Sequence, residues 1–307
     1  MSIDIPDPDR RGFLKCMTWA GSAALWTVAG GIPRSHIIGQ ANAAETGFTF
    51  AQVSDSHLGF DKPANPNVTN TFQQALDYVT AMPEKPAFII HTGDITHLSK
   101  PVQFDTGAQL LGATKLPVYT VPGEHDVLED DRKSYLNHYG KGTKGDGWYS
   151  FNASGVHFVG LVNVMNLQGN GLGDLGQAQL EWLEKDVKGL SSSTPIVVMA
   201  HVPLWLVYQD WGWGTADGAQ ALSYMKRFGS VTVLNGHIHQ IMQKVEGHVA
   251  FHTARSTAFP QGVPGVAQAP GPVMVPPGDL QKFLGTAKVT LVNNKTPLAI
   301  VDTPLAG

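Results

Sequence analysis

Seven Asp, Glu and His residues with metal-binding side chains occur in five short clusters along the chain. Each cluster follows an apolar run that is rich in β-branched or aromatic residues. Carboxylate and imidazole groups bind Zn, Fe and Mn, and one carboxylate can bridge two ions. We therefore predict that the following side chains form a metal site: Asp55, His57, Asp94, Glu124, His201, His237 and His239.

The apolar runs that precede the clusters are predicted to be buried strands, because they are short, continuous and bounded by turn formers. They cover residues 48–53, 87–91, 117–121, 195–200 and 231–235. If these strands share one sheet, their carboxyl ends lie along one edge, where five loops present the clusters to a common point. A helix over residues 70–82, capped by Thr69 and Asn70, is expected to connect the first two strands.

The rest of the chain completes an α/β pattern. Further helices are predicted over residues 177–187 and 217–228, and a hairpin is predicted from residues 148–151 and 156–162. Short strands follow over residues 242–245, 249–252, 288–292 and 298–301, and residues 260–278 form an irregular Pro- and Gly-rich loop. This order predicts an α/β fold in which two sheets form a sandwich flanked by helices.

The composition excludes several classes of protein. With 307 residues, of which 42% are hydrophobic and 15% are charged, the chain can form one large α/β domain or two small ones. The net charge is −4 and Lys and Arg form no long run, so a nucleic-acid-binding surface is not expected. Cys16 is the single cysteine, which excludes a disulfide framework and a cysteine-ligated zinc site.

The N-terminus has the composition of an export signal. Arg10 and Arg11 precede a mildly apolar stretch over residues 16–32, which ends before a small-residue cleavage site at residues 41–44. The Arg pair followed by Phe-Leu-Lys resembles a twin-arginine signal. An amphipathic helix is the alternative, but several glycines make this segment a poor helix.

We expect cleavage after Ala43, which divides the chain into a signal peptide over residues 1–43 and one domain over residues 44–307. The twin-arginine export machinery would then be a partner, and the mature protein would be periplasmic or secreted. Because that machinery carries folded proteins, a metal centre could be loaded in the cytoplasm. No other segment reaches the ~18 consecutive apolar residues of a membrane span, so no stable membrane anchor is expected.

The five clusters resemble the signature of the calcineurin-like metallophosphoesterase family. That signature consists of Asp-x-His, Gly-Asp, Gly-Asn-His followed by Asp or Glu, a lone His after a strand, and Gly-His-x-His. Residues 55–57, 93–94, 201 and 236–239 match outright, and residues 123–126 match at three of four positions. Residues 156–159 and 179–183 also resemble the family's intervening segments. Five matches in order are a specific signal.

The resemblance implies a four-layer fold and two divalent or mixed-valence metal ions, which would be Fe, Mn or Zn. The first ion would be held by Asp55, His57 and His239, with Asp94 bridging to the second. The second ion would be held by Glu124, His201 and His237. Such a centre activates a hydroxide that attacks the phosphorus of a phosphomonoester or phosphodiester in line.

The resemblance also implies roles for the two residues after Glu124. His125 would stabilise the phosphoryl charge or protonate the leaving alkoxide, and Asp126 would orient the His125 ring. The alternative function is a periplasmic metal-binding protein of the same fold with weak or no phosphatase turnover. A pure metal binder has no need of the His125 and Asp126 pair, which favours the enzyme. A small phosphorylated compound is the expected substrate.

Glu124 departs from the family, which has Asn at this position. A carboxylate binds hard cations more strongly than an amide oxygen does, which favours Fe or Mn. It also adds a negative charge where an anionic substrate docks. Either a higher-valent ion balances this charge, or phosphatase activity is weakened.

Two other groups of residues have less specific interpretations. The aromatic residues of segment 204–214 either stack on a planar leaving group or form a cluster that holds the loop, and the second is favoured: Trp205, Tyr208, Trp211 and Trp213. Among the remaining histidines, His91 and His157 are expected in the core, and His138 on a helix surface. His97 is expected to be a solvated loop residue rather than part of the site mouth.

Overall fold

The computed structural model describes residues 23–29, 32–38, 48–129, 132–276, 278–291 and 298–306, and only the backbone of the first two ranges. The chain forms two compact units, Met1–Thr46 and Gly47–Gly307. In the first unit, β1 (Ala23–Ala29) pairs antiparallel with β2 (Ile32–Ile38). The Arg pair and the predicted cleavage site lie outside the described residues. Among the helices described, none combines the length and apolar character needed to cross a bilayer.

The first sheet of the second unit has five strands in the order β13-β12-β3-β4-β5. Their bounds are β3 Phe48–Val53, β4 Ile89–His91, β5 Val118–Thr120, β12 Gly285–Leu291 and β13 Ala299–Pro304. Strands β3, β4 and β5 are parallel, and their register places Val53, His91 and Thr120 side by side. The loops that carry the first three clusters therefore begin at the same level of the sheet.

The second sheet has six strands in the order β10-β11-β9-β8-β7-β6. Their bounds are β6 Tyr149–Ala153, β7 Val156–Gly160, β8 Ile196–Met199, β9 Val231–Asn235, β10 Gln243–Glu246 and β11 Val249–Thr253. The five strands that precede the clusters are therefore divided between the two sheets, three in the first and two in the second. Continuous apolar runs show that a strand is buried, but they do not identify its neighbour.

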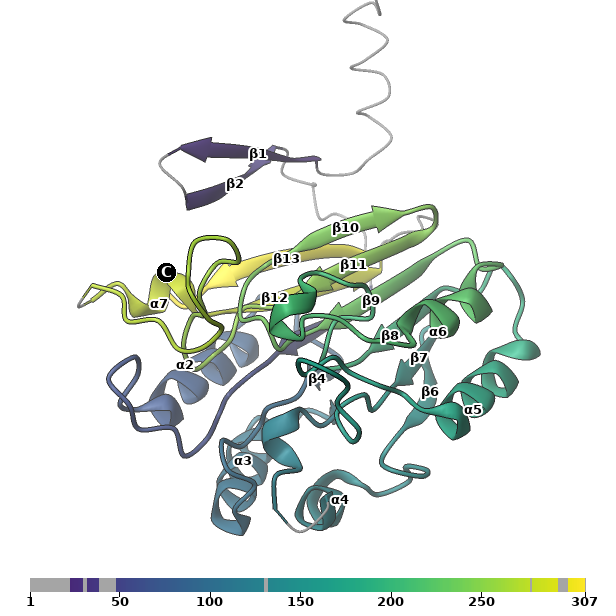
Figure 1. Ribbon diagram of the computed structural model, residues 1–307, viewed down its shortest axis with the longest axis horizontal. Coiled ribbons are helices and arrows are strands. Elements are labelled where there is room, and N and C mark those ends of the chain that lie inside the picture. Colours follow the sequence, from purple (N-terminus) through teal and green to yellow (C-terminus); the bar gives the residue numbers. More distant parts are fainter. Residues whose placement is uncertain are drawn as a thin grey trace, which may run out of the picture. The chain divides into compact units, whose positions relative to one another are not determined.

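Helices cover the outer face of each sheet (Figure 1). Helices α2 (Val68–Thr80), α3 (Pro101–Ala113) and α4 (Lys133–Tyr139) pack against the first sheet. Helices α5 (Gln177–Lys188) and α6 (Gly218–Met225) pack against the second. Phenylalanines fill the space between the sheets, where Phe50 and Phe158 each lie within 5.4 Å of Phe88, measured between ring centroids. The predicted two-sheet sandwich flanked by helices is confirmed.

Most predicted elements are present with small shifts of their bounds. Helix α2 begins two residues before the predicted start, and its cap is Asn67, whose side chain accepts a hydrogen bond from the main-chain N–H of Asn70. The predicted hairpin is formed by β6 and β7. Residues 260–276 contain no helix or strand, only an isolated bridge between Gln261 and Pro272. This agrees with the predicted irregular loop. The short helix α7 (Leu280–Phe283) follows.

Candidate metal centre

The loops after β3, β4, β5, β8 and β9 bring all seven predicted metal ligands together. Hydrogen bonds join the two sheets at this point, because the side chain of Gln52 donates to the main-chain oxygen of Asn235. The Asp55 carboxylate also accepts from the main-chain N–H of His237. The clusters from both sheets therefore meet at one edge of the sandwich.

Several residues other than glycine at this edge have a positive φ, which strains the backbone. Nine described residues other than glycine have a positive φ, a region that L-residues avoid because Cβ is crowded there. Five of the nine belong to the predicted ligands: Asp55, His57, Asp94, His237 and His239. Strain of this kind persists where the surrounding structure imposes it, and it is concentrated at functional sites.

Two glycines of the clusters are required by the close approach of the loops. A Cβ atom on Gly123 would lie 2.1 Å from Oδ1 of Asp94. A Cβ atom on Gly236 would lie 2.6 Å from Oδ2 of Asp55. Both distances are far inside van der Waals contact, so any side chain here would displace a predicted ligand.

The first group of donor atoms is compact. Nε2 of His57 lies 3.2 Å from Nε2 of His239, which lies 3.3 Å from Oδ1 of Asp55. Two donors that share an ion at bond lengths of about 2.1 Å are separated by roughly 3.0 to 3.4 Å. The separations within this group therefore fit a single metal ion.

The second group has similar spacings. Nε2 of His201 lies 3.0 Å from Oε2 of Glu124, and Nδ1 of His237 lies 3.0 Å from Oε1 of the same carboxylate. Oδ2 of Asp94 lies 3.3 Å from Nε2 of His201 and 3.5 Å from Nε2 of His57. A single oxygen of Asp94 is thus close to both groups, which is the position of a bridging ligand.

Several polar atoms of the centre are buried without a hydrogen-bond partner among the described residues. They are Oδ2 of Asp55, Oε2 of Glu124, Nε2 of His201 and both ring nitrogens of His237. Burying such atoms unpaired is costly, and burying carboxylates without a cation costs more. The donor set therefore fits metal ions, which would satisfy lone pairs and charge together.

The electrostatics of the site favour a cation. Burial and the neighbouring histidines keep the pKa of His57 well below its usual value, so its lone pair is available. Burial opposes a charge on His201, but the carboxylates of Asp94 and Glu124 outweigh it and raise the pKa of His201 well above its usual value. Without a metal ion, a proton on His201 provides the positive charge that balances these carboxylates. A bound metal ion would replace that proton.

Most of the ring nitrogens that face away from the centre are held by acceptors. Nδ1 of His201 donates to the main-chain oxygen of Thr92, and Nδ1 of His239 donates to that of Phe259. Such outer contacts fix the tautomer in which Nε2 carries the lone pair for the metal. The chain therefore prepares these histidines as ligands.

The two residues after Glu124 differ in their contacts. His125 lies at the centre, its main-chain N–H donating to Asp94 and its Nδ1 donating to the main-chain oxygen of His97. Burial opposes a charge on His125, but Asp94 and Glu124 outweigh it and raise its pKa. The ring is thereby held next to both carboxylates.

The predicted orienting role of Asp126 is wrong. Its carboxylate accepts hydrogen bonds from the main-chain N–H groups of Gly123, Ile95 and Thr96, and from the Thr96 hydroxyl. Residues Glu124–Asp126 form a 3-10 turn, so the Asp126 side chain folds back towards Gly123 while the His125 ring points elsewhere. Asp126 ties the second and third loops of the first sheet together.

His97 belongs to the site, against the prediction of a solvated loop residue. Its Nδ1 lies 3.3 Å from Nδ1 of His57, and its ring stacks on that of His125 with the centroids 4.9 Å apart. The only signal in the sequence was its position three residues after Asp94.

Two of the other histidines lie in the core. His91 is buried, accepts a hydrogen bond from the main-chain N–H of Gly93 and contacts the Ser56 hydroxyl, as predicted for a core residue. His157 is also buried and pairs with Asp186.

The aromatic segment after His201 forms a packed cluster. Trp213 is buried and lies edge-on to Trp211, which lies edge-on to Tyr208. Trp205 packs on Phe251 of β11. These contacts support the interpretation that the cluster holds the loop.

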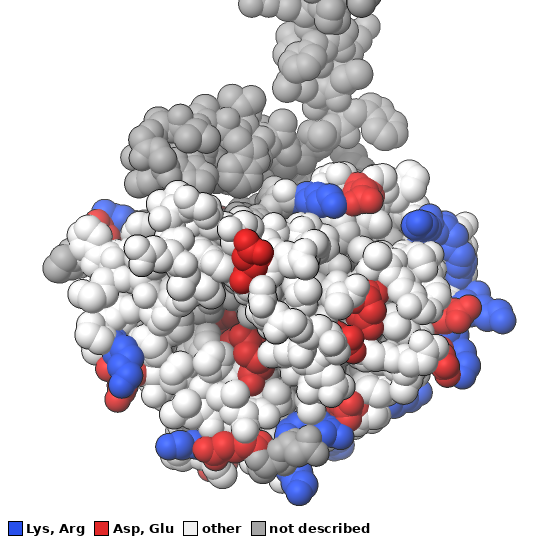
Figure 2. Space-filling view, in the orientation of Figure 1, with Lys and Arg blue, Asp and Glu red and all other residues white. Residues whose placement is uncertain are grey.

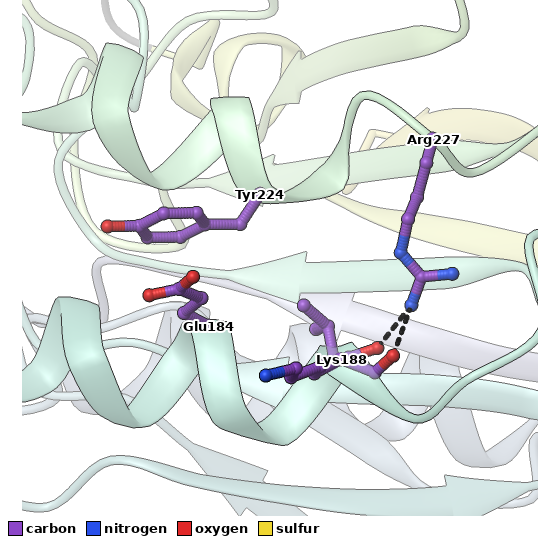
Figure 3. Close-up of a pocket in the computed structure, with 5 residues that line it drawn as sticks. Glu184, Lys188, Tyr224 and Arg227 are labelled. Atoms are coloured by element: carbon purple, nitrogen blue, oxygen red, sulfur yellow. Dashed lines mark hydrogen bonds between the residues drawn. The ribbon is translucent and has the colours of Figure 1, made fainter.

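Figure 2 shows Lys and Arg mainly around the periphery of one face. A separate pocket of about 190 Å³ lies between α5 and α6 and is lined by Glu184, Val187, Lys188, Tyr224 and Arg227 (Figure 3). The guanidinium of Arg227 donates to the main-chain oxygens of Val187 and Lys188, at the end of α5. This arginine caps the C-terminal end of α5.

Residues 48–241 match the family described as calcineurin-like phosphoesterases. The chain belongs to this family. Its members depend on two metal ions, and the candidate ligand groups described above lie within the matched segment.

Curated relatives include phosphatases and phosphodiesterases. A zebrafish (Danio rerio) serine/threonine-protein phosphatase CPPED1 is 25% identical over 63% of this chain and 70% of its own. The glycerophosphodiester phosphodiesterase GpdQ of Enterobacter lignolyticus is 24% identical over 62% of this chain and 70% of its own. The match to purple acid phosphatase 15 of Arabidopsis thaliana, at 28% identity, covers 41% of this chain but only 25% of that protein. This chain is thus a metal-dependent phosphoric ester hydrolase.

The fold is also that of solved relatives. The crystal structure of a dimetal phosphatase from Danio rerio superposes with a TM-score of 0.64 at 17% identity, covering 84% of this chain and 96% of that one.

Proposed function

We propose that this chain is an exported phosphoesterase that uses two metal ions to hydrolyse a phosphomonoester or a phosphodiester. The observation that carries the proposal is the pair of donor groups with Asp94 close to both. The first ion would be held by Asp55, His57 and His239, and the second by Glu124, His201 and His237.

Two ions held there would polarise the phosphoryl oxygens and make water acidic enough to act as a nucleophile near neutral pH. The protein's own residues would supply orientation and charge. His125, with Nδ1 committed to the main-chain oxygen of His97, keeps its other ring nitrogen for the phosphoryl group or the leaving oxygen.

Glu124 indicates the class of metal. Each donor group contains one carboxylate and two imidazoles, and Asp94 adds a shared carboxylate. Three carboxylates in a buried site favour harder ions, so we propose Fe or Mn over Zn.

Export is the second element of the proposal. It rests on Arg10 and Arg11, the apolar stretch that follows and the small residues up to Ala44. Replacing both arginines by Lys should retain the full-length protein in the cytoplasm, measured by cell fractionation and N-terminal sequencing of the secreted form. Unchanged export of the double variant would contradict the twin-arginine route.

The catalytic proposal is tested by metal analysis of the purified mature protein together with assays on p-nitrophenyl phosphate and bis-p-nitrophenyl phosphate. We expect about two ions per chain and hydrolysis of at least one substrate, lost on chelation and restored by Mn²⁺ or Fe²⁺. Two bound ions without hydrolysis of either compound would favour a metal-binding protein with weak or no turnover.

A further inference from the structure

His97 contacts both a proposed metal ligand and the proposed catalytic histidine, and it lies outside the two ligand sets proposed above, although it forms a candidate donor group with His57 and His125. The two Nδ1 atoms of His57 and His97 are 3.3 Å apart. The rings of His97 and His125 stack at an angle of 15°. One side chain thus joins the first ligand group to the residue that would face the substrate.

The contact with His57 has a defined direction once Nε2 of His57 binds metal. A neutral imidazole carries one proton, so metal at Nε2 leaves the proton on Nδ1 of His57. Nδ1 of His97 must then accept this proton in a hydrogen bond. His201 and His239 use main-chain oxygens as the corresponding acceptors, whereas His57 uses a side chain that mutation can alter.

The His97 ring is held in place by its surroundings. Its main-chain N–H donates to the main-chain oxygen of Leu58, and Phe60 lies edge-on to its ring with the centroids 5.2 Å apart. Phe60 in turn packs on Phe259, which contacts His57. A solvated loop side chain would not have these contacts.

We propose that His97 is a positioning residue, which accepts the outer proton of His57 to secure the first metal ion and stacks on His125 to fix its ring. This inference rests on the proposed metal centre. Outer partners of metal-bound histidines typically change metal affinity or activity by about 10- to 100-fold when they are replaced.

Three variants separate the two contacts. His97→Asn places an amide oxygen near the position of Nδ1 and removes the ring. His97→Phe keeps a ring for His125 and removes the acceptor, and His97→Ala removes both. The main-chain oxygen that holds Nδ1 of His125 is retained in all three. His138→Phe is the matched control, since His138 is also a stacked histidine but lies on α4 and contacts Phe104 and Asp105.

The primary measurement is Mn²⁺ affinity, from metal content across a chelator series and from the EPR spectrum, which distinguishes a coupled pair from one ion. We expect His97→Phe and His97→Ala to bind the first ion about 10- to 100-fold more weakly, and His97→Asn to bind within a few fold of wild type. In contrast, kcat should fall in His97→Asn and His97→Ala with little change in KM.

Wild-type affinity in His97→Ala, or equal loss in His97→Asn and His97→Ala, would overturn the proposal. Thermal unfolding shows whether each variant folds. If His97→Phe does not fold, the comparison of His97→Ala with His97→Asn still tests the proposal. Because metal affinity is measured without substrate, a wild type that binds two ions but hydrolyses nothing would refute the catalytic function and leave this test intact.

Discussion

The two halves of the metal centre differ in how firmly the chain holds their ligands. In the first, the side chains of Asp55, His57 and His239 are at most 3% exposed. In the second, Glu124 and His237 are 23% and 13% exposed. The outer nitrogens of His57 and His239 have partners, as does that of the buried His201 in the second group. His237 has no hydrogen bond on either ring nitrogen among the described residues, although its Nδ1 faces Glu124 at 3.0 Å.

This difference separates two tasks of the centre. A buried group with fixed tautomers binds an ion with little reorganisation, because its donor atoms are already positioned. A more exposed group is accessible to substrate, and its ligands must be ordered by the ion. Glu124, where this chain departs from the family signature, lies in the more exposed group.

The largest effect is expected from Asp94, the ligand that both halves share. Asp94→Asn keeps an oxygen that can accept from the main-chain N–H of His125, but it removes the negative charge near both ions. Loss of transition-state charge stabilisation worth about 4 kcal/mol lowers kcat about 10³-fold. Metal content should fall from two ions per chain in the same variant, measured by mass spectrometry of metals.

The control for this prediction is Asp105→Asn, which changes an exposed carboxylate on α3 that pairs with His138. It should keep both ions and the wild-type rate. Two tightly bound ions in Asp94→Asn, with kcat within tenfold of wild type, would show that Asp94 does not connect the halves.

How much the sequence predicts differs between local and long-range features. The bounds of β3 and β9 match the prediction to the residue, because short apolar runs between turn formers determine them. The two-sheet sandwich was predicted, but the neighbours of each strand were not, since β3 pairs with β12, whose residues lie more than 200 positions away. Pairing at that separation depends on the whole fold.

Helix α3 was not predicted, and the reason is visible in its packing. Gly107 lies in the middle of this helix and lowers its intrinsic helix propensity. A Cβ atom at this position would lie 2.9 Å from the Ile95 side chain and 3.1 Å from the Tyr139 hydroxyl. Tertiary packing thus requires Gly107, the residue that makes this helix hard to predict from the sequence.

The metal ligands were recognisable because their types recur in a known order, whereas their outer partners were not. The side chain of His97 and the main-chain oxygens of Thr92 and Phe259 hold ligand rings through long-range contacts. A main-chain oxygen has no signature in a sequence. The misassigned role of Asp126 has the same origin, because adjacent residues in a turn point in different directions.

A smaller effect is expected from Glu124, which sharpens the comparison because it belongs to the second half alone. Glu124→Asn restores the family residue and removes one charge from the second group. Even at a high effective dielectric constant, a unit charge within 4 Å of a cation is worth several kcal/mol, of which the amide dipole recovers part. We expect the second ion to bind at least about tenfold more weakly and the first to bind unchanged.

The measurement is metal stoichiometry at limiting Mn²⁺, together with kcat at saturating Mn²⁺. Glu129→Gln is the control, because it also removes one negative charge, at an exposed position of the same loop. An unchanged metal content and rate in Glu124→Asn would count against a contribution of the Glu124 carboxylate to binding of the second ion.

The smallest effect is expected at a histidine and carboxylate pair outside the metal centre, His157 and Asp186. Asp186 accepts hydrogen bonds from His157 at 2.8 Å and from the Ser150 hydroxyl at 2.7 Å. Burial opposes its charge, but these hydrogen bonds outweigh burial and lower the pKa of Asp186 below its usual 3.8. The pair should therefore stabilise the fold without affecting metal.

The sign of the pH dependence follows from that shift. Because the pKa of Asp186 is lower in the folded state, its stabilisation is complete above the unfolded value near 3.8 and is lost as the pH falls through the folded value. Asp186→Asn should lower the free energy of unfolding by about 1 to 2 kcal/mol at pH 7, and by less at pH 3. Urea denaturation at both pH values tests this, and metal content should equal that of wild type. A difference in the free energy of unfolding between variant and wild type that grows on acidification would contradict this prediction, as would loss of a metal ion from the variant. Either result would show that the pair does not have a purely structural role, unlike the residues of the metal centre.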